Sequence, residues 1–301
     1  MITNLHKPIM VREISSFLSN DKELSILDCT FGGGGHSLRF LDLGHKVTAI
    51  DEDLKAQEIA KDLRTKFNKF NFYKINFKDF EKIDEDCLKN KFDFILLDLG
   101  FSSNQLENIQ IGISFKENSD LNMNYLNSDF TAYDIINNYS EEDLSRVFSD
   151  YGEIKQSLKL AKFIVRSRKD KSINTNFELI EVLRDSGVNF RSKKIHFATQ
   201  AFQALRIECN KELENLNIFL KKIYNYLNKN GILAIISFHS LEDRIIKNYF
   251  KTNSYKKGDY KNQNDWGFEI LTKKPITPNH LEIKNNPRSR SSKLRIGRFI
   301  N

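Results

Sequence analysis

Cysteine is scarce in this chain of 301 residues, which contains only Cys29, Cys87 and Cys209. Their number is odd and no two of them have a C-x-x-C spacing, so the sequence argues against a disulfide framework and against a structural zinc site. The six histidines are also dispersed and form no H-E-x-x-H motif. We therefore predict reduced thiols and no metal bound by the chain's own motifs.

Long apolar segments are missing as well. No run reaches the roughly 20 residues that a transmembrane helix needs, and the N-terminal MITNLHKPIM lacks the hydrophobic stretch of a signal peptide. We therefore expect a cytoplasmic protein that does not enter a membrane. A chain of this length with 40% hydrophobic residues can bury one large domain, or one domain plus an insert.

Acidic residues are absent after Glu282, whereas basic residues are frequent there: Lys284, Arg288, Arg290, Lys293, Arg295 and Arg298. The formal net charge of +7 suits a polyanionic partner, although AT-rich coding would also enrich lysine. Because arginine binds phosphate in a bidentate manner, we predict that Arg288, Arg290 and Arg295 contact nucleic-acid phosphates. The alternative is that they brace the last strand by pairing with acids such as Glu269.

The most informative motif is DCTFGGGGHS, from Asp28 to Ser37. The pattern predicts a buried strand over 25–31 and a helix that begins at Ser37 and is closed by Gly44. The four glycines between them let the backbone turn sharply and approach a ligand. A strand, a glycine turn and a helix form the adenosine-cofactor half-site of a doubly wound sheet. The alternative is that the four glycines serve only a strained turn that binds no ligand.

The next predicted strand, KVTAID, ends in Asp51, where a carboxylate can accept hydrogen bonds from ribose hydroxyls. A solvated strand end or a helix cap is the alternative for this residue. The NAD fingerprint G-x-G-x-x-G is not met, because its third glycine would fall on Ser37. A mononucleoside cofactor such as S-adenosylmethionine has no pyrophosphate to bind and does not require that glycine.

A third strand, within KFDFILLDLG, is apolar from Phe94 to Leu97, as is typical of a strand buried on both faces. It ends in Asp98 at the sheet edge where ligands bind in open α/β sheets. We expect Asp28, Asp51 and Asp98 to face one crevice, whose acidity suits a cationic, amine-bearing cofactor.

The next convincing strand is 231–238, and the hundred or so residues before it are predicted to be helical. Four helices are expected in this insert, over 129–138, 141–151, 153–169 and 177–185. The lysines of the third of them form either an RNA-binding face or a solvated one. One long helix, with an apolar stripe from Phe202 to Leu227, is expected to follow the insert.

The end of strand 231–238 carries His239, which either faces the substrate or has a capping or core role. Ser240 with Asp243 resembles a capping box at the start of the next helix. The segments 268–273 and 293–299 predict a closing antiparallel hairpin.

Five motifs occur in a fixed order: DCTFGGGGHS, DLGFSSNQL, HFATQAFQALRIECNKEL, ISFHSLEDRIIK and NPRSRSSKLR. Together they resemble the bacterial ribosomal RNA small-subunit methyltransferase H family, over nearly the whole chain. The resemblance implies methylation of the N4 amine of a cytidine in 16S rRNA, in the decoding region, with S-adenosylmethionine as cofactor. Its expected partner is the 16S rRNA or the small ribosomal subunit.

The fold that the resemblance implies is α/β: a class I S-adenosylmethionine-dependent methyltransferase with a Rossmann-like, seven-stranded, mostly parallel sheet and an inserted helical domain. We expect residues 1–106 and 206–301 to form the methyltransferase core, and 107–205 to form the inserted substrate-recognition domain.

The resemblance also assigns roles to individual residues. It implies that the cofactor is bound by Gly34, Gly35, His36, Asp51, Phe77, Asp98 and Gln105. Beside these, Asp98, Phe101, Ser102 and His239 are candidate catalytic residues, and Arg206 is expected to join the tail arginines in RNA binding. The chain departs from the family at Cys29, where glycine is usual, and in the run from Leu121 to Tyr125, where Asn122 and Asn124 replace an acid and a base.

Two other functions remain open. A DNA amino-methyltransferase would carry a D/N/S-P-P-Y/F motif at the fourth strand end, but here that position reads Asp98-Leu99-Gly100-Phe101 without prolines. A non-catalytic RNA-binding assembly factor with the same fold is the other alternative, and it would not bind S-adenosylmethionine.

Overall fold

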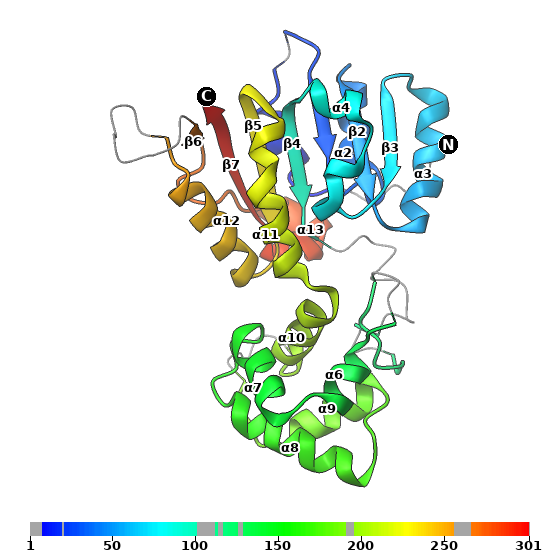
Figure 1. The fold of residues 1–301 in the computed structure, drawn as a ribbon, viewed down its shortest axis with the longest axis vertical. Helices are drawn as coiled ribbons and strands as arrows, with labels where there is room; N and C mark the ends of the chain where they lie inside the picture. The colour runs from blue at the N-terminus through cyan, green and yellow to red at the C-terminus, as the bar shows by residue number, and fades with distance from the viewer. Residues whose placement is uncertain are drawn as a thin grey trace. The chain divides into compact units, whose positions relative to one another are not determined.

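The computed structural model describes residues 8–19, 21–100, 112–113, 117–125, 129–190, 196–255 and 266–300. The chain divides into two compact units (Figure 1). The core unit comprises Met1–Ser103 and Glu214–Asn301, and the helical unit comprises Asn104–Leu213. The helical unit ends at Leu213 rather than at residue 205, because a helix runs across that position.

The core unit is built on one seven-stranded sheet with the order β3-β2-β1-β4-β5-β7-β6. The five strands β1 to β5 are parallel to one another, and β7 is antiparallel to both β5 and β6. The predicted seven-stranded, mostly parallel sheet and its closing hairpin are thus confirmed. The strands are β1 (Ser25–Asp28), β2 (Lys46–Asp51), β3 (Phe70–Lys74), β4 (Phe92–Asp98), β5 (Leu227–Ser237), β6 (Gly267–Ile270) and β7 (Lys293–Ile300).

The central strands are apolar because both faces of the sheet are covered. On β4, Phe94 and Leu96 pack toward one face, and Ile95 and Leu97 toward the other. The first face carries α1 (Val11–Ser15), α2 (Gly35–Asp42) and α3 (Leu54–Lys66). The second carries the 3-10 helix η1 (Phe77–Lys82), α4 (Glu85–Lys89), most of α11 (Glu212–Lys222), the 3-10 helix η3 (Ile223–Tyr226) and α12 (Ser240–Thr252). Between β6 and β7 lie α13 (His280–Asn285) and the 3-10 helix η4 (Pro287–Ser291).

The helical unit has its own apolar core, which includes Phe148, Leu160 and Leu205. Its helices are α6 (Ala132–Asn138), α7 (Glu141–Asp150), α8 (Ser157–Asp170), α9 (Asn176–Asp185) and α10 (Thr199–Asn210). On α8, Leu158 is 51% exposed.

Several element boundaries differ from the sequence prediction; β1, for example, ends at Asp28 and not at Phe31. The single helix expected from Phe202 to Leu227 is broken at Lys211, whose φ of 51° is left-handed and ends α10. Strand β3 ends at Lys74 and does not reach Phe77. Phe77 instead begins η1, because the side chain of Asn76 accepts a hydrogen bond from the Lys78 N–H (3.0 Å) and caps that helix.

Within the residues that the structure describes, no helix combines the length and the apolar character needed to cross a membrane.

Candidate active site

The glycine turn joins β1 to α2 at the carboxyl edge of the sheet. Gly32 and Gly34 have φ of 52° and 77°, which favour glycine. The Gly34 N–H donates to the Phe31 carbonyl (2.7 Å), and a Cβ at Gly34 would lie 2.7 Å from the end of the Phe31 ring. Since Phe31 is itself packed against Phe70 and Phe72, the turn is held in place by the apolar core.

Asp51 ties the glycine turn to the end of β2. Its carboxylate accepts hydrogen bonds from the backbone N–H groups of Gly32 (2.7 Å) and Asp53 (2.9 Å). Burial raises the pKa of Asp51 to about 6. Each carboxylate oxygen keeps a second lone pair, so this side chain can still accept a hydrogen bond from a ligand.

Asp28, the third predicted acid, is fully buried and does not reach a crevice. Its carboxylate accepts from the Ser37 hydroxyl (2.6 Å) and from the Thr30 N–H (3.3 Å). Burial raises the pKa of Asp28 above its ordinary value. The expectation that Asp28 faces the crevice is therefore wrong: it fixes the first turn of α2 on β1, and the crevice acids are those at the ends of β2 and β4.

His36 and Asp98 come together from α2 and β4. The His36 Nε2 lies 3.8 Å from the Asp98 Oδ2. The histidine is 6% exposed, and neither of its ring nitrogens has a hydrogen-bond partner among the described residues. The Asp98 backbone N–H donates to the Thr30 hydroxyl (2.8 Å), while its side chain stays 17% exposed. Buried polar atoms without partners are rare, so this pair indicates a place for a ligand.

Phe101, Ser102 and Gln105 lie outside the described residues. Their predicted roles remain predictions.

Sequence reasoning missed Glu52, which follows Asp51 directly. Glu52 accepts a hydrogen bond from the side-chain amide of Asn76 (2.9 Å). Burial raises the pKa of Glu52 to about 7. Phe77, which follows Asn76 in the sequence, is half-buried and packs edge-on against Phe219. The acidic run Asp51-Glu52-Asp53 could have indicated Glu52, because one acid of such a run can be buried at the edge of the sheet.

Glu52 is expected to make stability depend on pH. Its carboxyl group has an ordinary pKa of 4.5 when unfolded and about 7 when folded, so the folded state holds the proton more tightly. The free energy of unfolding should therefore fall as pH rises from about 4.5 to about 7, by at most about 3 kcal/mol from this group.

Thermal melting of the ligand-free protein across this range measures the effect. The variant Glu52→Gln should lose part of the pH dependence, whereas Glu58→Gln, on the exposed side of α3, should keep it. An identical pH profile for wild type and Glu52→Gln would show that Glu52 is not buried as described.

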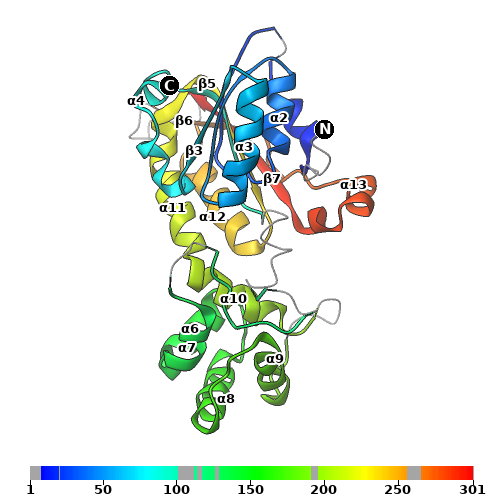
Figure 2. The ribbon, with the colours of Figure 1, turned by 90° about the vertical axis from the view of Figure 1, so that its right-hand side faces the viewer.

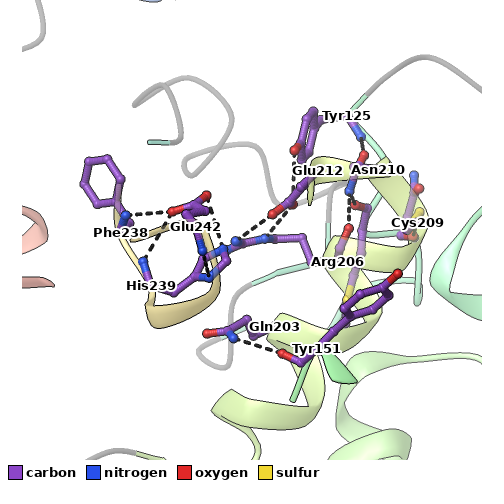
Figure 3. Close-up of polar contacts among 12 residues, drawn as sticks. Tyr125, Tyr151, Gln203, Arg206, Cys209, Asn210, Glu212, Phe238, His239 and Glu242 are labelled. Carbon is purple, nitrogen blue, oxygen red and sulfur yellow. Dashed lines mark hydrogen bonds and ion pairs between the residues drawn. The ribbon is translucent and has the colours of Figure 1, made fainter. Parts of the chain in front are cut away.

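His239 is the N-cap residue of α12 (Figure 3). Glu242 completes a capping box by accepting from the N–H groups of Phe238 (2.7 Å) and His239 (3.3 Å). The His239 Nε2 lies 3.2 Å from the Glu242 carboxylate, and both side chains are buried. The expected capping box of Ser240 and Asp243 is therefore wrong, and the structure favours the capping role for His239 over a catalytic one.

Asp243 is instead paired with Arg295 of β7. The Arg295 guanidinium donates to both carboxylate oxygens (2.7 and 3.3 Å), and Arg295 is 8% exposed. Burial by itself would raise the pKa of Asp243, but the bonds from Arg295 and Lys293 hold it below its ordinary value. Arg295 therefore braces the last strand, which was the alternative to phosphate binding. Arg288 and Arg290, in contrast, are exposed on η4.

Arg206 lies in the helical unit and is also paired. It donates two hydrogen bonds to Glu212 (2.8 and 3.0 Å), and Glu212 accepts a third from the Tyr125 hydroxyl (3.1 Å; Figure 3). This arrangement holds the Arg206 side chain within its own unit, and the predicted role of Arg206 in RNA binding stays a prediction.

The two asparagines that depart from the family pattern are structural. The Asn124 side-chain amide donates to the Phe130 carbonyl (2.6 Å), and Asn122 accepts from the Asn124 N–H (3.1 Å). Cys29, the other departure, is buried at 1% exposure beneath the glycine turn.

These groups fit an adenosine-type cofactor at the carboxyl edge of β1, β2 and β4. Asp51 and Glu52 offer acceptors to ligand hydroxyls or amines, Phe77 offers an aromatic edge, and the His36–Asp98 pair offers polar atoms that protein groups leave unused. The surroundings are acidic, which suits a ligand with positive charge.

Comparison with known sequences gives a match along the whole chain. The sequence model of the MraW methylase family matches residues 3–300. A protein of Sulfurihydrogenibium sp. named ribosomal RNA small subunit methyltransferase H is 43% identical over 300 residues, covering 98% of this chain and 99% of that protein. Proteins of the same name from Brachyspira hyodysenteriae and Rickettsia prowazekii are each 40% identical, covering 98% and 99% of this chain and 97% and 100% of theirs.

Among solved structures, a putative methyltransferase from Streptococcus mutans in complex with SAH covers all of both chains at 11% identity, with a TM-score of 0.44.

Proposed function

This chain belongs to the MraW methylase family, and from that membership we propose that it methylates the N4 amine of a cytidine in 16S rRNA, with S-adenosylmethionine as methyl donor. The observation that carries the proposal is the full-length identity of 40 to 43% to proteins named ribosomal RNA small subunit methyltransferase H. The decoding region is the expected location of the cytidine, from the resemblance of the five sequence motifs.

The residues around the glycine turn are those proposed to hold the cofactor. Gly34 and Gly35 bring backbone close to it, Asp51 accepts from its ribose hydroxyls, and Phe77 covers its adenine. His36 and Asp98 lie toward its methionine end. When bound, S-adenosylmethionine supplies an electrophilic methyl group on a sulfonium.

The acceptor amine of cytosine is a poor nucleophile, because its lone pair is delocalised into the ring. We propose that Asp98 accepts a hydrogen bond from this amine, which returns electron density to the nitrogen, and takes its proton late in the reaction. Placement of the amine in line with the methyl group supplies much of the rate. The base must be unpaired or leave its stack for its N4 edge to be reached.

The decisive experiment compares substrates with labelled S-adenosylmethionine. We expect label to enter unmethylated small-subunit rRNA or 30S particles but not genomic DNA, and mass spectrometry to locate it on one cytidine N4. Transfer to DNA alone would establish the DNA amino-methyltransferase. Failure to bind S-adenosylmethionine in calorimetry would establish the assembly factor.

Arg290 is expected to contact RNA phosphate, because it is exposed on η4 in a segment without acids. Arg290→Ala should lower the slope of log affinity against log salt by about 0.7 to 0.9, since one fewer counterion is released on binding. Its melting temperature and its affinity for S-adenosylmethionine should stay at wild-type values. A lowered melting temperature with an unchanged slope would mean that Arg290 braces the core unit instead.

A further inference from the structure

A hollow of about 470 Å³ lies on one side of the core unit, between α1, α2 and α13. Figure 2 shows α2 and α13 on the same side of this unit. None of the groups assigned to the cofactor lines it except Gly35, at the start of α2, so it opens beside the glycine turn. We call this hollow the α1–α2–α13 groove.

The groove combines three kinds of chemistry. Its wall includes two arginines, Arg12 of α1 and Arg39 of α2. Both are exposed, and the guanidinium group of neither forms an ion pair or hydrogen bond with any residue that the structure describes. Leu38 supplies apolar surface, and the amides of Asn285 and Asn286 supply uncharged donors and acceptors.

Acidic residues limit what the groove can bind. Glu13 and Asp42 also line it, as does Glu282, whose carboxylate accepts from the Met10 N–H (2.6 Å). Mixed charge of this kind disfavours a densely charged duplex face. It suits a ligand with one phosphate, a flat apolar body and a hydrogen-bonding edge, which together describe a single unpaired nucleotide.

The course of the chain connects the groove to the predicted RNA contacts. Asn286 directly follows α13 and precedes η4, which carries the exposed Arg288 and Arg290. The wall of the groove thus includes Gly35 of the cofactor turn, and Asn286 of the same wall leads directly into the arginine segment.

We propose that the α1–α2–α13 groove binds one unpaired nucleotide of the substrate RNA, whose phosphate is held by Arg12 and Arg39. The planar guanidinium groups suit bidentate phosphate binding, while the asparagine amides and Glu13 or Asp42 meet the edge of the base. This inference rests on the proposed function, because it takes RNA to be the substrate.

The test measures binding of unmethylated small-subunit rRNA at several salt concentrations. Arg12→Gln and Arg39→Gln should each weaken binding several-fold at low salt and lower the salt slope by about 0.7, the value for single-stranded contacts. Arg39→Lys should restore most of the slope. Lys89→Gln, on α4 at the opposite face of the sheet, removes the same charge and should behave as wild type.

The outcomes separate this inference from the proposed function. Wild-type protein that neither binds nor methylates the rRNA would overturn both. Wild-type methylation with unchanged affinity and salt slope in both arginine variants would overturn the groove alone. Melting temperature and S-adenosylmethionine affinity should match wild type in both variants. A loss of RNA binding accompanied by a fall in either would also count against the groove, because it would make the arginines structural.

Discussion

Asp98→Asn is expected to lower kcat for methyl transfer by two to four orders of magnitude. The carboxylate lies at the carboxyl end of β4, remains partly exposed and is 3.8 Å from the unpartnered ring of His36. In the proposed reaction it accepts the amine proton, and a positioned acid or base contributes about 10²- to 10⁴-fold. An amide has the same shape but cannot accept that proton.

Single-turnover kinetics with saturating cofactor measure the effect, and calorimetry with S-adenosylhomocysteine separates chemistry from binding. Among the described residues, Asp98 Oδ1 accepts only a long hydrogen bond from the Gly100 N–H (3.4 Å), so Asp98→Asn should fold normally. Asp93→Asn, on the same strand but near its amino end, is the matched control. If Asp98→Asn kept wild-type kcat, Asp98 would have no role as proton acceptor.

Arg295→Met is expected to destabilise the protein by about 2 to 4 kcal/mol. Removing one partner of a buried ion pair leaves the other charge uncompensated, which for fully buried pairs costs about 3 to 5 kcal/mol. Here Lys293 remains as a second partner of Asp243 at 3.3 Å, so we expect the smaller value. Chemical denaturation of Arg295→Met against wild type measures it.

The double variant Arg295→Met with Asp243→Leu should recover much of the lost stability, because it replaces both charges by apolar groups. The salt slope of RNA binding should be the same for wild type and Arg295→Met, in contrast to Arg290→Ala. A lowered slope without any loss of stability would restore the phosphate role that the sequence first indicated for Arg295.

The charged tail shows how far the sequence could be interpreted. Its lack of acids within 283–301 correctly left both phosphate binding and bracing open, but the choice between them depended on which residue faces Arg295. That partner, Asp243, is 52 residues away in sequence. It lies on α12, which packs against β7. Such a pairing depends on how β7 aligns with β5, which no local pattern encodes.

The cofactor edge shows the same division. The glycine turn and the acids that end β2 and β4 were predictable, because strand burial, glycine conformations and strand ends each leave a local pattern. The burial of Asp28 and Glu52, which raises the pKa of each, and their hydrogen bonds to Ser37 and Asn76 were not predictable.

The sequence by itself determined the family, the parallel sheet with its glycine turn, and the presence of a helical insert, since these follow from motifs and from periodic burial along the chain. Only the tertiary structure decided the roles of individual charged residues. It paired Arg295 with Asp243, bound Arg206 to Glu212, made His239 a helix cap and left the side chains of Arg12 and Arg39 without partners among the described residues. The physical reason is that the energy of a charge depends on its burial and on partners distant in sequence, whereas strand and helix patterns are written in neighbouring residues.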